Sequence, residues 1–120
     1  MVKVAMEDKY VGIMLMSGVD DGLLLTFGDD AGSQDGGDWT LTIGRKEDND
    51  VCLRNDTYSS RYHAKLHRRD QGWWLEDCDS KNGTFIEDNV DDQRVTGTIP
   101  LIDGQLFRVG RTWMRIQPAE

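Results

Sequence analysis

The sequence predicts an all-β fold, a sandwich or barrel of ten or eleven short strands. No stretch repeats its apolar residues with the period of an α-helix. Short apolar runs instead alternate with polar residues, as in half-buried strands, and clusters of Gly, Asp, Asn and Ser separate them. Ten or eleven strands of ordinary length in about 110 residues leave no room for a helical layer.

The first four strands are predicted from apolar runs in the N-terminal half of the chain. Their ranges are 10–16, 23–27, 39–43 and 51–53. The third is the clearest, because Trp39, Leu41 and Ile43 alternate with threonines and fall on one face. Cys52 lies inside the fourth run, where we expect a small buried side chain.

The C-terminal half supplies the remaining strands. Their ranges are 64–67, 73–75, a short segment around residue 85, 99–101, 107–109 and 113–116. In the first of these, Ala64 and Leu66 point one way, so His67 is expected to point outward and to be exposed. Trp73 and Trp113 are expected in the core, because aromatic residues on strands usually pack there.

One segment of biased composition interrupts the strands. Residues 28–38 are rich in Gly and Asp, but their spacing does not follow the order of an EF-hand calcium loop, since Ala31 stands where a ligand should fall. We therefore expect a mobile acidic loop. Residues 1–9 are expected to form a lead-in, and residues 10–118 a single domain.

Composition and charge exclude several functional classes. A chain of 120 residues can bury a core without metal or disulfide staples. Its formal net charge of −8 argues against nucleic-acid and anionic-membrane binding, which need a basic face. The acidic balance is interpreted as a solubility feature.

Cysteine content and hydropathy predict a cytoplasmic setting. Cys52 and Cys78 are too few and too far apart for a disulfide framework or a zinc site. No apolar stretch approaches the ~18–20 residues of a membrane span. The N-terminus lacks the apolar core of a signal peptide. We expect no cofactor and no metal.

Three loops carry the residues that point to a function. They are residues 43–46, 58–63 and 77–85, and each combines a cation with short hydrogen-bonding side chains. Loops at one end of a sandwich can converge on a common ligand. All of the candidate side chains can donate hydrogen bonds and three are positively charged, so together they would form an anion site. These residues are Arg45, Ser60, Arg61, Lys81 and Asn82.

Four segments, in this order, carry a resemblance to a known family. They are IGRKEDNDVCL (43–53), SSRYHAKL (59–66), WLEDCDSKNGTFI (74–86) and LIDGQLFRVG (101–110). Together they resemble the forkhead-associated (FHA) domain, a phosphothreonine-binding module used in signalling. The similarity covers most of residues 11 to 117. It implies an eleven-stranded β-sandwich of two twisted sheets, as in SMAD-like domains, with binding loops at one end.

The resemblance also implies a role for each candidate ligand. Arg45 would pair with phosphate oxygens, and Ser60 would donate its hydroxyl to another. Arg61 would hold phosphate or peptide backbone, and Lys81 would face the phosphothreonine. Asn82 would bond the peptide main chain beside it.

The same resemblance implies structural roles for other residues. His63 would tie the binding loops together from beneath, with Gly44, Gly83 and Thr84 supporting them. Tyr58 is our candidate for contacting the residue three places after the phosphothreonine, where this family often discriminates. The partner would be a phosphothreonine-containing protein or a segment of the parent chain. The sequence departs from the family after residue 86, where Glu87 begins an acidic stretch instead of a second Asn-Gly turn, so that hairpin is expected to be longer.

Other interpretations of these residues remain open from the sequence. Arg45 could pair with Glu47 or Asp48, Arg61 could pair with Asp56, and Ser60, Lys81 and Asn82 could be ordinary turn residues.

Two other functions also remain. The fold could serve a phosphate-independent interaction, although Arg45, Ser60 and Asn82 favour phosphate binding. Ser60 and His63 could form a hydrolase pair, but the sequence shows no orienting acid or oxyanion hole.

Overall fold

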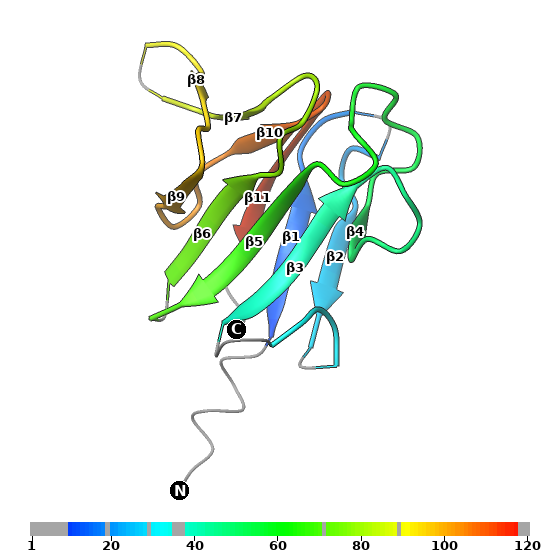
Figure 1. Ribbon diagram of the computed structural model, residues 1–120, viewed down its shortest axis with the longest axis vertical. Coiled ribbons are helices and arrows are strands. Elements are labelled where there is room, and N and C mark those ends of the chain that lie inside the picture. Colours follow the sequence, from blue (N-terminus) through cyan, green and yellow to red (C-terminus); the bar gives the residue numbers. More distant parts are fainter. Residues whose placement is uncertain are drawn as a thin grey trace, which may run out of the picture.

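The computed structural model describes residues 10–18, 20–28, 30–34, 38–70, 72–88 and 90–117. These residues form eleven strands and no helix, arranged as two sheets that face each other (Figure 1). The predicted eleven-stranded β-sandwich is confirmed. The expected lead-in, residues 1–9, lies outside the described residues, as does residue 118.

The first sheet has six antiparallel strands in the order β2-β1-β11-β10-β7-β8. In chain order they are β1 (Val11–Leu15), β2 (Leu24–Phe27), β7 (Thr84–Ile86), β8 (Gln93–Arg94), β10 (Phe107–Val109) and β11 (Thr112–Gln117).

The second sheet has five strands in the order β4-β3-β5-β6-β9. They are β3 (Trp39–Gly44), β4 (Val51–Cys52), β5 (Ala64–Arg69), β6 (Gly72–Asp77) and β9 (Thr98–Leu101). The pairing of β3 with β4 is parallel, and the other pairings in this sheet are antiparallel.

The core lies between the sheets and follows the strand alternation. Along the central strands, inward-pointing buried residues alternate with more exposed ones, so that both inner faces are apolar. The buried apolar side chains are Val11, Ile13, Leu15, Trp39, Leu41, Ile43, Val51, Leu53, Ala64, Leu66, Trp73, Leu75, Val95, Phe107, Val109 and Met114. Trp39 packs against Trp73 with ring centroids 5.7 Å apart, which closes the core at one end.

Three expectations about burial are wrong. Trp113 lies on the outer face of the first sheet, because Thr112 and Met114 point inward, and it packs against Arg108. His67 is not exposed, since its ring contacts the Thr40 hydroxyl and the Glu76 carboxylate, each at 2.8 Å. Cys52 is only half-buried.

Strand β8 was not predicted from the sequence. Gln93 and Arg94 are both exposed, so no apolar alternation marks them. They pair with β7 across residues 87–92, the hairpin that we expected to be long.

Part of the acidic loop is held by hydrogen bonds that were not predicted from the sequence. Ser33 and Thr40 exchange two backbone hydrogen bonds of 2.9 and 2.7 Å. The indole of Trp39 donates to the carbonyl oxygen of Ala31 at 2.8 Å, and Gly32 N–H donates to Asp50. Residues 31–33 are therefore anchored to the edge of β3.

The two ends of the sandwich differ in what they carry. Gly12 on β1 pairs with Gln117 on β11, so the start of the first strand and the end of the last lie side by side. β3 runs from Trp39 at this end to Gly44 at the other. The three loops singled out above all lie at the Gly44 end, the upper end of the molecule in Figure 1.

Removing a core ring should destabilise the domain. Phe107 is fully buried between the sheets, so Phe107→Ala should lower the free energy of unfolding by roughly 3–5 kcal/mol. Leu24→Ala on the outer face, where Leu24 is 45% exposed, should cost less than about 1 kcal/mol. Urea unfolding of both variants checks this, and equal costs would contradict the placement of the core.

Candidate functional site

The first and second loops are joined by backbone hydrogen bonds. Arg45 N–H donates to the carbonyl oxygen of Ser60 at 3.0 Å, and Lys46 N–H donates to that of Arg61 at 3.3 Å. The Arg45 side chain adds a third bond, from Nε to the carbonyl oxygen of Ser59 at 3.1 Å. This bond orients the guanidinium, and its two terminal nitrogens have no hydrogen-bond partner among the described residues.

Gly44 and Asn49 explain how these two loops come so close. A Cβ atom added at Gly44 would lie 2.1 Å from the carbonyl oxygen of Arg61, so only glycine fits there. The Asn49 amide donates to the carbonyl oxygens of both Lys46 and Arg61, at 2.9 and 2.8 Å. Asn49 was not among the residues predicted from the sequence, because its burial beside the Gly-Arg turn becomes visible only in the structure.

The second and third loops meet at Ser60. Lys81 N–H donates to Ser60 Oγ at 3.1 Å, and the Asn82 side-chain amide donates to the carbonyl oxygen of Tyr58 at 2.9 Å. Because Ser60 Oγ accepts from Lys81, its own proton is available for another acceptor. The structure therefore brings Arg45, Ser60, Lys81 and Asn82 onto one hydrogen-bonded framework.

His63 lies beneath this framework and is fully buried. Its Nδ1 contacts the backbone nitrogen of Ser60 and its Nε2 contacts the carbonyl oxygen of Gly83, both at 2.9 Å. A backbone N–H can only donate and a carbonyl can only accept. The ring is therefore neutral, with its proton on Nε2. Burial lowers the pKa of His63 below its ordinary value of 6.5, against the opposing effect of the Gly83 carbonyl.

This geometry excludes Ser60 and His63 as a nucleophile and base. Both ring nitrogens of His63 are engaged with backbone groups, and Ser60 contacts the ring through its backbone nitrogen, not through Oγ. The Ser60 hydroxyl therefore makes no direct hydrogen bond to the imidazole.

The third loop is built around the carboxylate of Asp77. Ser80 Oγ and Thr84 Oγ1 both donate to Asp77 Oδ1, at 2.6 and 2.7 Å, and Gly83 N–H donates to Ser80 Oγ. Burial would raise the pKa of Asp77, but the hydrogen bonds from Ser80 and Thr84 outweigh it and lower the pKa below 3.8. Gly83 adopts a positive φ of 88°, which suits glycine.

A second carboxylate, the buried Asp56, supports the second loop. It accepts hydrogen bonds from Tyr58 N–H, Arg111 N–H and the Thr112 hydroxyl, at 3.0, 2.8 and 2.7 Å. Asp56 is only 7% exposed, and its oxygens are taken by these donors, so it does not pair with Arg61. The sequence reading missed this role, because two of its partners lie more than fifty residues away.

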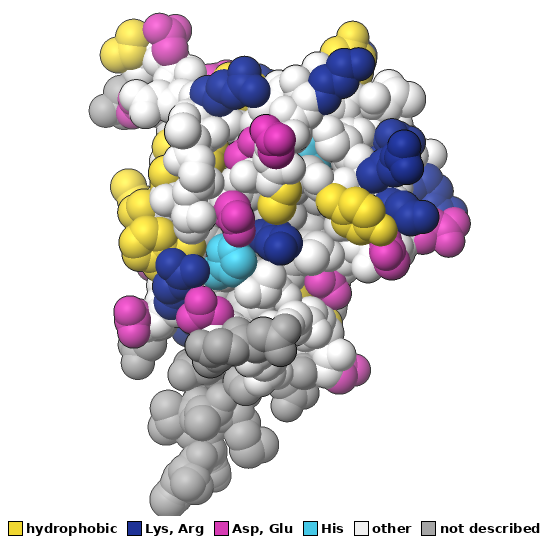
Figure 2. All heavy atoms as spheres, viewed as in Figure 1, with side chains coloured by type: hydrophobic (Ala, Val, Ile, Leu, Met, Phe, Trp, Pro, Cys, Tyr) yellow, Lys and Arg dark blue, Asp and Glu magenta, His cyan; other side chains and the backbone are white. Residues whose placement is uncertain are grey.

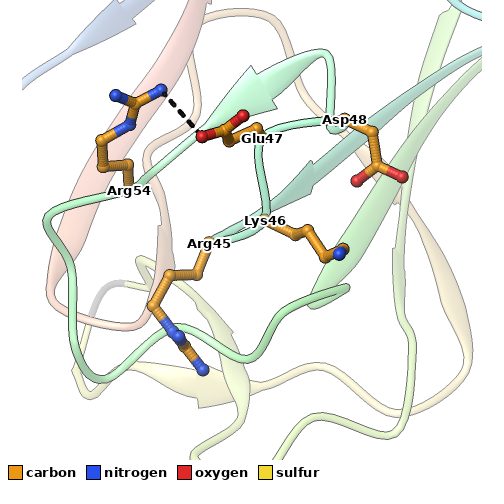
Figure 3. A pocket seen from close by; sticks show the side chains of 5 residues that line it. All are labelled: Arg45, Lys46, Glu47, Asp48 and Arg54. Carbon is orange, nitrogen blue, oxygen red and sulfur yellow. Dashed lines mark ion pairs between the residues drawn. The ribbon is translucent and has the colours of Figure 1, made fainter.

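A hollow opens beside the first loop, lined by Arg45, Lys46, Glu47, Asp48 and Arg54 (Figure 3). Glu47 reaches Arg54 at 3.9 Å, and the Arg45 side chain points away from that pair (Figure 3). Asp48 accepts from the Tyr62 hydroxyl at 2.8 Å. The two nearest carboxylates therefore face other partners, and Arg45 is not neutralised by either of them.

Exposed cations gather at this end of an acidic chain. Seven described Lys or Arg residues are exposed, and all of them lie in these loops or contact them: Arg45, Lys46, Arg54, Arg61, Lys81, Arg94 and Arg111. In Figure 2, dark blue side chains follow the upper and right margins, where the loops lie in Figure 1. The remaining described cations are half-buried on the sheets. The loop end therefore favours an anionic ligand.

Two kinds of feature are absent from the described residues. No group of three or more His, Cys, Asp or Glu side chains among them is arranged to hold a metal ion. They also contain no helix long and apolar enough to cross a membrane.

Burial of neutral His63 should make stability depend on pH. Its folded-state pKa lies below its unfolded value, so the unfolded chain binds the extra proton and stability falls as pH drops through about 6.5. His63→Ala should be roughly 1–3 kcal/mol less stable at pH 7.5, because it leaves Ser60 N–H and Gly83 C=O unpaired.

The measurement is thermal unfolding of both proteins between pH 7.5 and 5. The variant should lose less stability over this range than the wild type. The shift at Asp77 acts only near and below pH 3.8 and does not contribute here. Parallel pH profiles would contradict the assignment.

Comparison with known proteins places the chain in a family. The family model for the FHA domain matches residues 41–110. The chain is 34% identical over 82 residues to the FHA domain-containing protein FhaB of Mycolicibacterium smegmatis, covering 68% of this chain and 50% of that protein. It is 36% identical over 78 residues to FhaB of Mycobacterium tuberculosis, covering 65% and 47%. The chain thus spans about half the length of the curated relatives it matches.

A solved structure agrees with this assignment. A domain studied for phosphothreonine-dependent FHA domain interactions superposes with a TM-score of 0.68 at 25% identity, over 92% of this chain and 98% of that one. The sequence model, the two relatives and the shared fold point to the same conclusion: this chain belongs to the FHA domain family.

Proposed function

We propose that this domain binds phosphothreonine in a partner protein, or in a segment of its own parent chain, and so mediates a phosphorylation-dependent interaction. The observation that carries the proposal is the environment of Ser60. Its carbonyl accepts from the first loop and its hydroxyl oxygen accepts from the third, so it lies where the three loops meet. One solved structure similar to this one was analysed for phosphothreonine-dependent FHA domain interactions.

Each side chain proposed to bind the phosphate carries hydrogen-bond donors or positive charge that suit an anion. Arg45 offers the two terminal nitrogens of a guanidinium whose orientation Ser59 already fixes. Ser60 offers its hydroxyl proton, and Arg61 and Lys81 add exposed positive charge. A tetrahedral dianion suits this set, because charge-assisted hydrogen bonds to several oxygens can form at once. Pre-oriented donors lose little entropy on binding.

Asn82 would hold the peptide next to the phosphate. Its side-chain nitrogen donates to Tyr58, and this bond orients the amide while its oxygen remains able to accept from a peptide N–H. Tyr58 is 44% exposed beside it and would contact a later peptide residue. We place this interaction in the cytoplasm, where Cys52 and Cys78 would remain free thiols.

A phosphothreonine-peptide library, with the flanking positions randomised, tests the function directly. Selection of phosphorylated over unphosphorylated sequences supports it. Tight binding of unphosphorylated peptides would instead indicate a phosphate-independent interaction domain.

Replacing Arg45 should abolish most phosphopeptide binding without unfolding the domain. One charge-assisted hydrogen bond contributes roughly 1.5–3 kcal/mol, so Arg45→Ala should convert a Kd of ~1 μM to tens of micromolar or weaker. Calorimetry measures the change. The matched control is Arg54→Ala, which removes an exposed cation that already pairs with Glu47 and should change Kd less than threefold. A loss below threefold in Arg45→Ala would remove Arg45 from the site.

The site should also prefer phosphothreonine to phosphoserine. The family resemblance implies a small pocket for the threonine methyl between the second and third loops, and one methyl group in a fitted pocket is worth roughly 10- to 200-fold. An aspartate should not substitute, because a planar single charge cannot engage Arg45, Ser60 and Arg61 together. Fluorescence anisotropy with peptides that differ only at this residue checks both points. Equal affinity for phosphoserine would refute the methyl pocket.

A further inference from the structure

Arg111 lies in the turn between β10 and β11 and is held against the second loop. Its Cζ atom is 3.8 Å from the centre of the Tyr58 ring. Its backbone N–H donates to Asp56 Oδ2 at 2.8 Å, and the other oxygen of that carboxylate accepts from Tyr58 N–H at 3.0 Å. One buried carboxylate therefore fixes the main chain under both members of the cation–aromatic pair.

The turn itself is tightly constrained. Gly110, which precedes Arg111, has a φ of 61°, and a Cβ there would lie 2.7 Å from both oxygens of Asp56. The backbone of Arg111 is thus locked in place, whereas its side chain is exposed. Substitution of the side chain should leave the fold intact, because the bond to Asp56 comes from the backbone.

The stacked guanidinium keeps its hydrogen-bond donors. A guanidinium stacked on an aromatic ring contacts the ring through its flat face. Its five N–H groups lie in the guanidinium plane, so they point away from the ring and can still donate. In the described part of the chain, the only contact recorded for the Arg111 side chain is the Tyr58 ring. It therefore presents an oriented, uncompensated cation to solvent.

Arg111 lies at the end of a connected row of site residues. Lys81 N–H donates to the Ser60 hydroxyl oxygen, and the neighbouring Asn82 donates to the carbonyl oxygen of Tyr58. The ring of Tyr58 in turn contacts the guanidinium of Arg111. If the phosphate of a bound peptide contacts Ser60 and the peptide continues over Asn82 in an extended conformation, the peptide advances roughly 3.3 Å per residue. It would reach the guanidinium within a few residues.

We infer that Arg111 is a specificity-determining residue that selects an acidic side chain, Asp or Glu, a few positions from the phosphothreonine. The inference rests on the proposed function and names the class of peptide that the site takes. A carboxylate matches the in-plane donors of a guanidinium and can accept two of them at once. The other exposed cations raise affinity for any acidic peptide, whereas a fixed guanidinium favours one position.

The test is an aspartate scan of the ligand. A phosphothreonine peptide with uncharged flanks is compared with versions that carry a single Asp, moved stepwise along both sides. Fluorescence anisotropy at constant ionic strength gives the affinity ratio to the uncharged peptide. Wild type should show one position with a gain of roughly three- to fivefold, the size of an exposed ion pair.

Variants assign that gain to a residue. Arg111→Gln should flatten the profile, and Arg111→Glu should transfer the preference to Lys at the same position. Arg54→Gln is the matched control, since it removes an exposed cation from the same end of the molecule and should keep the peak. Unchanged thermal unfolding of each variant confirms that the fold is retained.

The outcomes separate this inference from the proposed function. A flat profile in wild type, a gain that is equal at every position, or a peak that survives in Arg111→Gln would overturn it while phosphothreonine binding stands. Equal loss in Arg54→Gln would also overturn it, because general electrostatics would then explain the gain. Failure of the uncharged phosphothreonine peptide to bind at all would overturn the proposed function and this inference with it.

Discussion

The loop end of the sandwich depends on the two hydrogen bonds made by the buried ring of His63. One bond holds the backbone of Ser60 and the other holds the backbone of Gly83, so a single rigid imidazole sets the spacing between the second and third loops. The ring must stay neutral to make both bonds, and its burial keeps it so. The side chains proposed to bind phosphate need few further hydrogen bonds to hold them, because the His63 ring already positions the backbone of the second and third loops. Side chains that face the ligand can thus vary without loss of the frame.

The carboxylates of this region are used to build the loops, and this is why an acidic protein can present a cationic end. Asp56 and Asp77 accept hydrogen bonds from backbone N–H groups and hydroxyls, and no Lys or Arg side chain in the described residues pairs with either carboxylate. Asp50 accepts from the backbone and hydroxyl of Thr42, and Asp48 accepts from Tyr62. Hydrogen bonds from neutral groups stabilise a carboxylate without using up a cation. The charges of Arg45, Arg61 and Lys81 are therefore not neutralised by these carboxylates.

Most of the fold could be predicted from the sequence, since period-two alternation and turn residues mark ten of the strands. The exceptions have physical causes. β8 carries no apolar residue, so alternation could not reveal it. Trp113 is large and apolar, but its place in the strand turns it outward, and the smaller Met114 fills the core. His67 is satisfied by Thr40 and Glu76 on neighbouring strands, and such partners are known only once the register is fixed. The same limit applies to the site: motifs indicated Arg45, Ser60 and Asn82, whereas the role of Asp56 depends on contacts across the whole chain.

The pairing of Gly12 with Gln117 has a consequence for how such a domain works inside a longer polypeptide. The start of β1 and the end of β11 lie side by side at the end opposite the three loops. A short linker attached there would be separated from the loops by the length of the sandwich. A domain of this shape can be inserted into a host protein almost as a surface loop, because its two attachment points span little distance. The linker then limits the volume that the three loops can reach. Linker length would therefore set the effective concentration of a phosphorylated segment in the same molecule, without any change in the contacts between that segment and the loops.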